Sequence, residues 1–382
     1  MTLSREIGIA MAGYGMIGRI HTLGYRDIPL IYPGQLPKLR LVAVSTSRPE
    51  TARAAQVEAG FEAWYVDNQE LVSAEGVHVV DCVTPNHLHL PVVMAALRAG
   101  KHVYCEKPLA LNAEQARKMA AAAQAAQVQV GMTFNYRFIP AVIQARQLLQ
   151  SGEMGQIYAF RADYLHSGYQ DPQRAMSWRL RKELAGGGAL VDLGSHVIDL
   201  VRYLLGDFER LSCSLRTYIK ERPAQPGSQV MEKVAVDDAA WIRAELVDGA
   251  LGTIHVSRFA TGTQDDLLFE IYAEHGALRF NLMDANWLYW YDNRRTGGPR
   301  GGERGWTRLE TLQRYPHAKA PPARSPLGWA RTHTENQYAF LKAIAAGEKV
   351  QPDIQDGLQV QLVMDTAYRS AQSGEWLDVP GN

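Results

Sequence analysis

The sequence predicts an α/β protein with an N-terminal doubly wound parallel sheet and a C-terminal α+β domain containing a large, mostly antiparallel sheet. The chain has 382 residues, which is more than a single hydrophobic core usually organises. Apolar strands and Ala-rich helices alternate up to about residue 134, as in a parallel sheet. Later, turn signals such as Asp248-Gly249 favour antiparallel hairpins. We therefore expect domains at 1–134 and 135–382, with a C-terminal helix able to pack back on the first domain.

The first strand runs into a glycine-rich loop. Ile7 to Ala12 is apolar, Gly13-Tyr14-Gly15-Met16-Ile17-Gly18 follows, and a helix can continue from Arg19. The first glycine permits a tight turn, the second admits a pyrophosphate, and the third lets the helix pack on the strand. The helix start offers unpaired N–H groups to phosphates. A strand, this loop and a helix in that order predict a dinucleotide site, with an ordinary glycine turn as the alternative.

The second strand, Leu39 to Val44, carries the signal for the type of dinucleotide. An NAD site usually has an acidic residue here that holds the ribose 2′-hydroxyl. This chain instead reads Ser45-Thr46-Ser47-Arg48, with no carboxylate before Glu50. Hydroxyls and a guanidinium suit a 2′-phosphate. The residues therefore favour NADP over NAD, and a solvated loop arginine is the alternative.

Three later strands each end in polar residues. Thr84-Pro85-Asn86 follows an apolar strand interrupted by Asp81, Glu106-Lys107-Pro108 follows His102 to Cys105, and Asn135-Tyr136-Arg137 follows Val128 to Met132. Carboxyl ends of parallel strands line one crevice, so we expect Asn86 and Lys107 to face it together. His89 is interpreted as structural or as lining the cofactor. His87 and His89 lack further ligands at suitable spacing, so no metal site is predicted.

A glycine run in the second domain leads into a carboxylate and an imidazole. Gly186-Gly187-Gly188 is followed by Asp192 and His196. In a helix from about Leu190 these two side chains are i,i+4 neighbours, and the pair could act as a general acid and base. The alternative is that Asp192 caps a helix and His196 is a satisfied core residue.

The remaining pattern predicts hairpins, an irregular segment and two helices. The strand pairs flank Asp248-Gly249 and His275-Gly276, and the irregular segment is 293–326. Its length indicates either a functional or a disordered loop. Thr332 or Thr334 can cap a helix through Ala346, and another helix is expected from Ile354 to Gly374.

Composition excludes several classes of protein. Lys+Arg and Asp+Glu are both 40, so no net field attracts nucleic acid or anionic membrane. We recognise no apolar stretch of about 18 residues and no signal pattern at the N-terminus. The three cysteines have no paired spacing, which suits a reducing cytosol. We therefore expect a cytoplasmic protein.

Together these motifs resemble the Gfo/Idh/MocA oxidoreductases, which are sugar and polyol dehydrogenases with a Rossmann domain and an α/β domain. The glycine loop, Thr84-Pro85-Asn86, Glu106-Lys107-Pro108 and the run ending in Asp192 and His196 carry the resemblance. Tyr164, Ser177-Trp178-Arg179 and Glu221-Arg222-Pro223 look like the subgroup of levoglucosan, inositol and L-glucose dehydrogenases. The Ser45-Thr46-Ser47 stretch departs from that NAD-using subgroup and looks more like 1,5-anhydrofructose reductases, which use NADPH.

The resemblance implies roles for particular residues. Lys107 would contact the nicotinamide ribose and the reacting hydroxyl, Asp192 and His196 would hold the sugar, and His196 would exchange the proton. The peptide before Pro108 is expected to be cis, and the second-domain sheet to form homodimers or homotetramers. The full set of predicted cofactor-binding residues is Gly13, Tyr14, Gly15, Met16, Ile17, Ser45, Thr46, Ser47, Arg48, Thr84, Pro85, Asn86, His89, Glu106, Lys107 and Asn135. The predicted substrate-binding residues are Lys107, Tyr136, Arg137, Tyr164, Trp178, Arg179, Asp192 and His196.

The functional prediction is an NAD(P)-dependent dehydrogenase or reductase acting on a sugar or polyol. Its ammonium, carboxylate and imidazole groups manage the proton while the cofactor carries the hydride. Two alternatives remain open at this stage. One is a redox-assisted glycoside hydrolase or eliminase that retains its cofactor, and the other is a non-catalytic NADP(H)-binding sensor.

Overall fold

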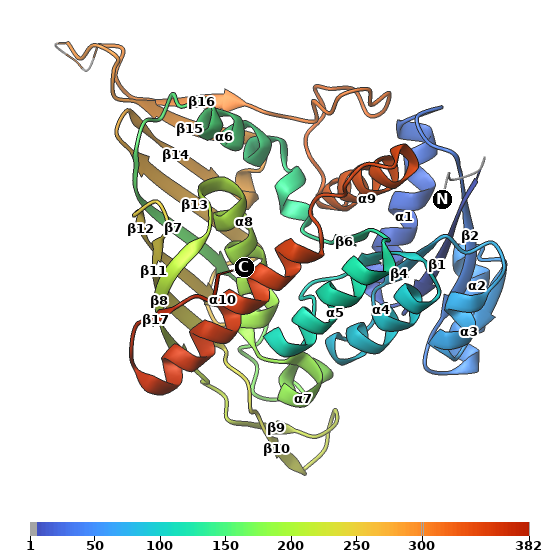
Figure 1. Cartoon of the computed structure of the whole chain (residues 1–382). Coiled ribbons are helices and arrows are strands. Elements are labelled where there is room, and N and C mark those ends of the chain that lie inside the picture. Colours follow the sequence, from blue (N-terminus) through green and yellow to red (C-terminus); the bar gives the residue numbers. More distant parts are fainter. Residues whose placement is uncertain (1–5, 299, 301, 382) are drawn as a thin grey trace. The chain divides into compact units, whose positions relative to one another are not determined.

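The structure is a computed structural model that describes residues 6–298, 300 and 302–381 (Figure 1). The chain divides into two compact units. The first comprises residues up to Phe138, Tyr315–Pro322 and Gly328–Gln361, and the second comprises Ile139–Arg314, Ala323–Leu327 and the residues from Leu362. Each unit contains its own sheet, and each is described by itself.

The first unit is built on a six-stranded parallel sheet in the order β3-β2-β1-β4-β5-β6. The strands are β1 (Glu6–Ala12), β2 (Lys38–Ser45), β3 (Ala63–Tyr65), β4 (Val79–Cys82), β5 (His102–Cys105) and β6 (Val130–Met132). The helices are α1 (Met16–Ile31), α2 (Pro49–Ala59), α3 (Asn68–Ser73), α4 (His89–Arg98), α5 (Ala113–Ala126) and α9 (Trp329–Ala346). This strand order is the dinucleotide-binding one, with its switch point between β1 and β4. The predicted Rossmann fold is confirmed.

Local sequence accounts for several helix ends in this unit. The Asn112 side chain accepts the Gln115 N–H at 3.0 Å and caps α5, while Gly60 ends α2 with φ +66°. One predicted start was wrong. Helix α9 begins at Trp329, and the Thr332 hydroxyl donates to the Trp329 carbonyl inside the first turn. Thr332 therefore lies within the helix that it was expected to cap.

The second unit contains a nine-stranded sheet in the order β16-β15-β14-β13-β7-β12-β11-β8-β17. Its strands are β7 (Ile157–Leu165), β8 (Phe208–Arg216), β11 (Ala239–Leu246), β12 (Leu251–Ser257), β13 (Asp266–Ala273), β14 (Gly276–Asn281), β15 (Trp287–Asp292), β16 (Trp306–Glu310) and β17 (Leu377–Asp378). Every pairing is antiparallel except β7 with β12, which is parallel. The predicted, mostly antiparallel sheet is confirmed, with this one parallel pair added.

Helices cover one face of that sheet. Helices α6 (Pro140–Gln150) and α8 (Ser195–Leu205) pack on it, and a short helix, α7 (Lys182–Ala185), precedes the glycine run (Figure 1). Along β11 and β13, buried residues alternate with more exposed ones, as expected for a sheet with one covered face. A separate hairpin joins β9 (Glu221–Pro223) to β10 (Met231–Lys233), and helix α10 (Ile354–Ser373) contributes residues to both units.

The segment predicted to be irregular, 293–326, includes a strand. It contains β16, while Tyr315–Pro322 belongs to the first unit, and Pro299 and Gly301 lie outside the described residues. One stretch, Lys182–Leu205, is long and apolar enough to be a candidate membrane span, which the sequence reading overlooked. Because 83% of its most apolar window is buried inside the structure, it has the character of a core helix.

Candidate active site

The glycine loop after β1 has the geometry that a dinucleotide needs. Gly13 has φ +93°, and a Cβ there would lie 2.8 Å from the Val83 carbonyl oxygen, so only glycine fits. A Cβ on Gly15 would meet no atom within 4 Å, which leaves the backbone open for a phosphate. Helix α1 starts at Met16 without a side-chain cap. Its first N–H groups are therefore suited to phosphate oxygens, and the residues present fit the group.

The residues after β2 separate into buried and exposed groups. Ser45 is buried, and its hydroxyl donates to the Asn68 side chain at 2.7 Å. Thr46 shares a 2.5 Å hydrogen bond with Thr51. Ser47 and Arg48 are exposed, and the Arg48 Nε lies 3.3 Å from an oxygen of Glu50. Of the four predicted residues, Ser47 and Arg48 are the most accessible to a ligand.

The ends of β4 and β5 are tied together by His89. Its Nδ1 lies 2.8 Å from the Pro108 carbonyl oxygen, and its Nε2 lies 3.0 Å from that of Thr84. The ring is fully buried, so His89 shapes this edge of the sheet from behind. Asn86 is also buried, and the Lys107–Pro108 peptide is cis, as the family resemblance implied.

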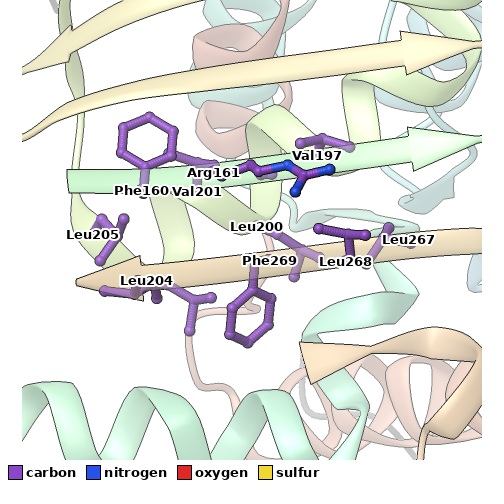
Figure 2. A pocket seen from close by; sticks show the side chains of 12 residues that line it. Phe160, Arg161, Val197, Leu200, Val201, Leu204, Leu205, Leu267, Leu268 and Phe269 are labelled. Atoms are coloured by element: carbon purple, nitrogen blue, oxygen red, sulfur yellow. The ribbon is translucent and has the colours of Figure 1, made fainter. Parts of the chain in front are cut away.

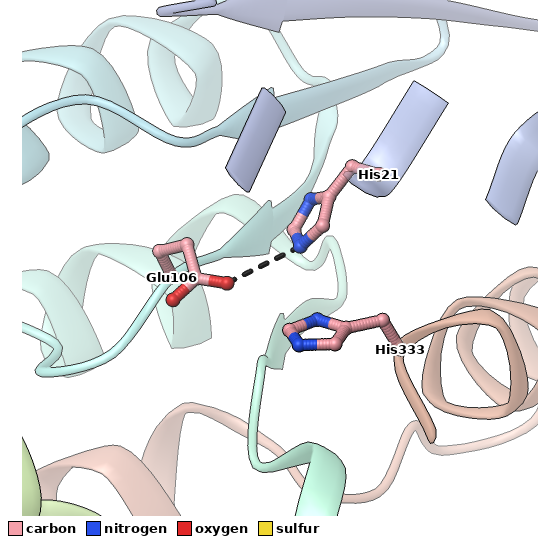
Figure 3. Close-up of side chains that lie close together, drawn as sticks. All are labelled: His21, Glu106 and His333. Carbon is pink, nitrogen blue, oxygen red and sulfur yellow. Dashed lines mark ion pairs between the residues drawn. The ribbon is translucent and has the colours of Figure 1, made fainter. Parts of the chain in front are cut away.

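A buried cluster of ionisable side chains contains His21, Glu106 and His333 (Figure 3). Glu106 is the residue immediately before Lys107. His21 of α1 places Nδ1 2.9 Å from Asp81 Oδ2 and Nε2 3.2 Å from Glu106 Oε1. The second contact is an ion pair whose geometry is not that of a straight hydrogen bond. The other oxygen of Glu106 accepts the backbone N–H of Lys107 at 3.2 Å, and Tyr25 donates to Asp81 at 2.8 Å.

These contacts set the ionisation of the cluster. Burial opposes a charge on His21, but Asp81 and Glu106 outweigh it and raise the pKa of this imidazole to about 10. Burial likewise opposes the charge of Glu106, yet His21 lowers the pKa of that carboxyl group. Burial, with the charge on His21, lowers the pKa of His333 to about 3. The arrangement is one imidazolium between two carboxylates, beside a neutral imidazole.

The same atoms raise the question of a metal ion. Donor atoms of His21, Glu106 and His333 lie within 4.8 Å of one another, and all three residues are buried. Sequence reasoning missed this cluster because His21 stands alone after the glycine loop. One signal was available, since Asp81 interrupts an otherwise apolar strand and a buried carboxylate requires a partner.

The residues after β6 are buried and engaged inside the first unit. Asn135 donates to the Thr332 hydroxyl at 2.8 Å, and the Tyr136 hydroxyl accepts from the Trp329 indole at 3.4 Å. The guanidinium of Arg137 lies 2.9 Å from Asp356 and is 7% exposed. These contacts fix the β6 end of the sheet.

In the second unit, Asp192 and His196 sit on a modified helix start. Leu190–Gly194 forms a π-helical turn, and α8 begins at Ser195, whereas an α-helix from Leu190 was predicted. Asp192 lies 2.9 Å from Nη2 of Arg258, a buried residue that sequence reasoning did not single out. Burial disfavours the charge of Arg258, but Asp192 raises its pKa. A permanent cation thus holds the Asp192 carboxylate.

His196 contacts the ring of Tyr164, which is itself tied to a polar pair. The rings of Tyr164 and His196 lie edge to face with centroids 5.9 Å apart. The Tyr164 hydroxyl donates to Asp265 at 2.6 Å, and His166 approaches the same carboxylate at 2.9 Å. The guanidinium carbon of Arg179 lies 4.4 Å from the ring centroid of Trp178, its neighbour in the sequence. Asp265 and His166 carried no sequence signal, because each lies in a polar stretch that contains no recognisable motif.

The apolar hollow of about 310 Å³ in Figure 2 is not the sugar site. It lies between β7, α8 and β13, and its lining is aliphatic and aromatic apart from Arg161. A sugar requires convergent hydrogen-bonding groups, which such a lining does not supply.

Family models and relatives match both halves of the chain. Residues 7–134 match the "oxidoreductase family, NAD-binding Rossmann fold", and residues 142–279 match the "GFO/IDH/MocA C-terminal domain". A levoglucosan dehydrogenase from Pseudarthrobacter phenanthrenivorans is 34% identical over 98% of this chain and 99% of its own length. The chain belongs to the Gfo/Idh/MocA oxidoreductase family. It is therefore an oxidoreductase of a family with an NAD-binding Rossmann fold, and the predicted family and enzyme class are confirmed.

Two further members of the family illustrate its chemistry. A structure titled levoglucosan dehydrogenase in complex with NADH and levoglucosan is 34% identical, with a TM-score of 0.92, covering 98% of this chain and all of that one. The scyllo-inositol 2-dehydrogenase (NAD(+)) of Bacillus subtilis is 29% identical over 72% of this chain and 74% of its own. Both names describe dehydrogenases of cyclic, polyhydroxylated compounds.

Proposed function

We propose that this Gfo/Idh/MocA protein oxidises a hydroxyl group of a pyranose, anhydrosugar or inositol, or reduces the corresponding ketone, with a nicotinamide dinucleotide. The observation that carries the proposal is Lys107, which follows β5 in the unit that also holds the dinucleotide loop. Carbinol dehydrogenation requires a group beside the cofactor that handles the hydroxyl proton. The names of the relatives support the substrate class.

The bound nicotinamide would supply the acceptor for the hydride that leaves the carbinol carbon. The loop from Gly13 to Ile17 would hold the dinucleotide phosphates through backbone N–H groups. The remaining predicted cofactor residues, among them Thr84, Asn86 and Asn135, would line its nicotinamide half at the ends of the strands.

The proton is assigned to residues of both units. We place Lys107 against the reacting hydroxyl, where its ammonium stabilises the developing alkoxide. His196 receives the hydroxyl proton during oxidation and returns it during reduction, while Asp192, held by Arg258, orients the sugar. Tyr164, Trp178 and Arg179, together with Tyr136 and Arg137, are assigned to substrate recognition, and 293–326 to specificity.

The cofactor we favour is NADP. Ser45 takes the place at the end of β2 where an NAD site usually has an acidic side chain, and the Arg48 side chain is 66% exposed. An exposed guanidinium beside Ser47 can pair with a 2′-phosphate. NAD is the alternative, because the levoglucosan dehydrogenase structure holds NADH.

We further propose a cytoplasmic homodimer or homotetramer formed through the large sheet. The face not covered by α6 and α8 carries large apolar side chains such as Trp241 and Tyr272, which are 39% and 38% exposed. Size-exclusion chromatography with light scattering would test this, and a monomer at micromolar concentration would contradict it.

A panel of inositols, pyranoses and anhydrosugars, each assayed with NAD+ and NADP+, tests the enzymatic proposal. We expect at least one compound to produce the absorbance of the reduced nicotinamide in stoichiometric amounts. Cleavage of a glycoside without net cofactor reduction would instead support the hydrolase or eliminase. Tight dinucleotide binding without turnover of any compound would support the sensor.

A further inference from the structure

We propose that His21 is a positioning residue whose imidazolium bridges Asp81 and Glu106, so that the Glu106 carboxylate stays ionised and holds the backbone of Lys107. This inference rests on the proposed catalytic role of Lys107. The contacts run from His21 of α1 to the Glu106 carboxylate that follows β5 (Figure 3). The same carboxylate accepts the backbone N–H of Lys107.

Distances and burial define the bridge. The side chains of His21 and Asp81 are fully buried, and that of Glu106 is 11% exposed. The ring contacts a carboxylate at each nitrogen, 2.9 Å away at Nδ1 and 3.2 Å at Nε2. A buried carboxylate is strongly disfavoured unless it is paired, and two carboxylates around one ring supply the charge that retains both ring protons.

The other groups that face His21 are uncharged or donate to the same carboxylates. Tyr104 and His333 contact the ring at centroid distances of 5.4 and 5.6 Å, and Tyr25 donates to Asp81. Both ring nitrogens of His333 lack a hydrogen-bond partner among the described residues. His333 therefore contributes no competing charge. His21 contributes most to lowering the pKa of Glu106, and the Lys107 ammonium adds a smaller effect.

The consequence for Lys107 is electrostatic and geometric. With His21 charged, Glu106 presents one oxygen to the imidazolium and the other to the Lys107 N–H. Without the imidazolium, burial would favour the protonated form of this carboxyl group. Lys107 would then lose a neighbouring negative charge, and a weaker, neutral acceptor would face its amide N–H.

The experiment compares His21→Gln with a double variant, His21→Gln/Glu106→Gln, and with Tyr32→Phe. Tyr32 is the matched control, because its hydroxyl donates to another buried carboxylate of the same unit, that of Glu335, at 2.6 Å. We expect His21→Gln to lower kcat at pH 7 at least tenfold, and kcat to recover as the pH is raised and Glu106 ionises. Dinucleotide Kd should stay within threefold of the parent.

The controls separate positioning from loss of stability. The double variant should lack the new pH dependence, because the group that titrates is gone, and Tyr32→Phe should keep the parental profile. A flat kcat profile for His21→Gln, or the same alkaline recovery in the double variant, would overturn the proposal.

A second measurement does not depend on turnover. NMR spectra of protein with ¹⁵N-labelled histidine identify the His21 signals as those that disappear in His21→Gln. In the parent protein these signals should show both ring nitrogens protonated at pH 8. A neutral His21 ring at that pH would overturn the proposal. So would one equivalent of zinc bound to the purified parent protein and absent from His21→Gln. If no compound of the sugar panel is turned over but His21 is doubly protonated, the proposed enzymatic function is contradicted. The proposed charge state of His21 then still stands.

Discussion

Each unit contains a histidine and an aspartate 2.9 Å apart, and the two pairs differ in burial. The His21–Asp81 pair of the first unit is fully buried, whereas in the His166–Asp265 pair of the second the side chains are 34% and 38% exposed. Water screens the exposed pair, so we expect it to contribute at most about 1 kcal/mol to the free energy of unfolding. The buried pair has no such screening, and although burial opposes a charge on His21, Asp81 and Glu106 raise its pKa to about 10. The two pairs therefore differ in their electrostatics although their His–Asp distances are equal. The difference in burial is the cause.

The largest effect should come from replacing the lysine next to the buried cluster. Lys107→Ala is expected to lower kcat by about 10²–10⁴-fold, the usual contribution of a positioned acid–base group. Dinucleotide affinity should change much less, which is measured by fluorescence titration. Lys118→Ala, at an exposed position of α5, is the control. Turnover within threefold of the parent in Lys107→Ala would remove this lysine from the chemistry.

His196 provides the corresponding test in the second unit. His196→Asn is expected to reduce kcat by about 10²–10³-fold through the loss of a proton acceptor. Asp192→Asn should act mainly on the KM for the sugar, because the carboxylate, held by Arg258, orients the substrate. Steady-state kinetics on the best compound of the panel measures both. Unchanged kcat in His196→Asn would assign the proton to another group.

Arg48 tests the predicted phosphate contact at the edge of the first unit. Arg48→Ala should weaken NADPH binding by about 10–150-fold, since hydrogen bonds to charged groups contribute about 1.5–3 kcal/mol. NADH binding should be unaffected, because that molecule lacks the 2′-phosphate. Equal affinities for NADPH in parent and variant, or tighter binding of NADH by the parent, would favour NAD as the cofactor.

The last prediction concerns the pH dependence of stability and not of activity. Because the pKa of His21 is raised in the folded protein, its contribution is fully present below pH 6.5 and is lost as the pH rises towards about 10. The slope is at most about 1.4 kcal/mol per pH unit. Urea unfolding from pH 6 to 10 should show this loss in the parent and less of it in His21→Gln.

His166→Gln is the matched variant for that experiment, with the same separation from an aspartate but an exposed setting. It should leave the alkaline slope of the parent unchanged. An equal loss of the slope in both variants would show that burial does not distinguish the two pairs.

At the acid end, His333 has a lowered pKa and should favour unfolding as the pH falls from 6.5 towards 3.

The sequence predicted those parts of the site that depend on backbone conformation. Gly13 needs a positive φ and Gly18 needs close packing, so the glycine spacing, together with the strand before it and the helix after it, located the loop. The helix start at Asp192 was less predictable, because a π-helical turn at Leu190–Gly194 changes the spacing that an α-helix would give. Asp192 is paired with Arg258 on another element, and no local pattern encodes that contact.

The buried cluster shows the same limit. His21, Asp81 and Glu106 come from three elements, and their charges depend on complete exclusion of water, which exists only after packing. A single acidic residue in an apolar strand was the available signal. The start of α9 was misjudged for a related reason, since Thr332 bonds to Trp329 within the helix.

A crystal structure of the protein with the oxidised dinucleotide and a sugar identified by the panel tests the central claim most directly. We predict that the Lys107 Nζ and a ring nitrogen of His196 both lie within hydrogen-bonding distance of one sugar hydroxyl, on the carbon that faces the nicotinamide. The two side chains pointing into separate cavities, with the sugar contacting only one of them, would contradict the proposed mechanism.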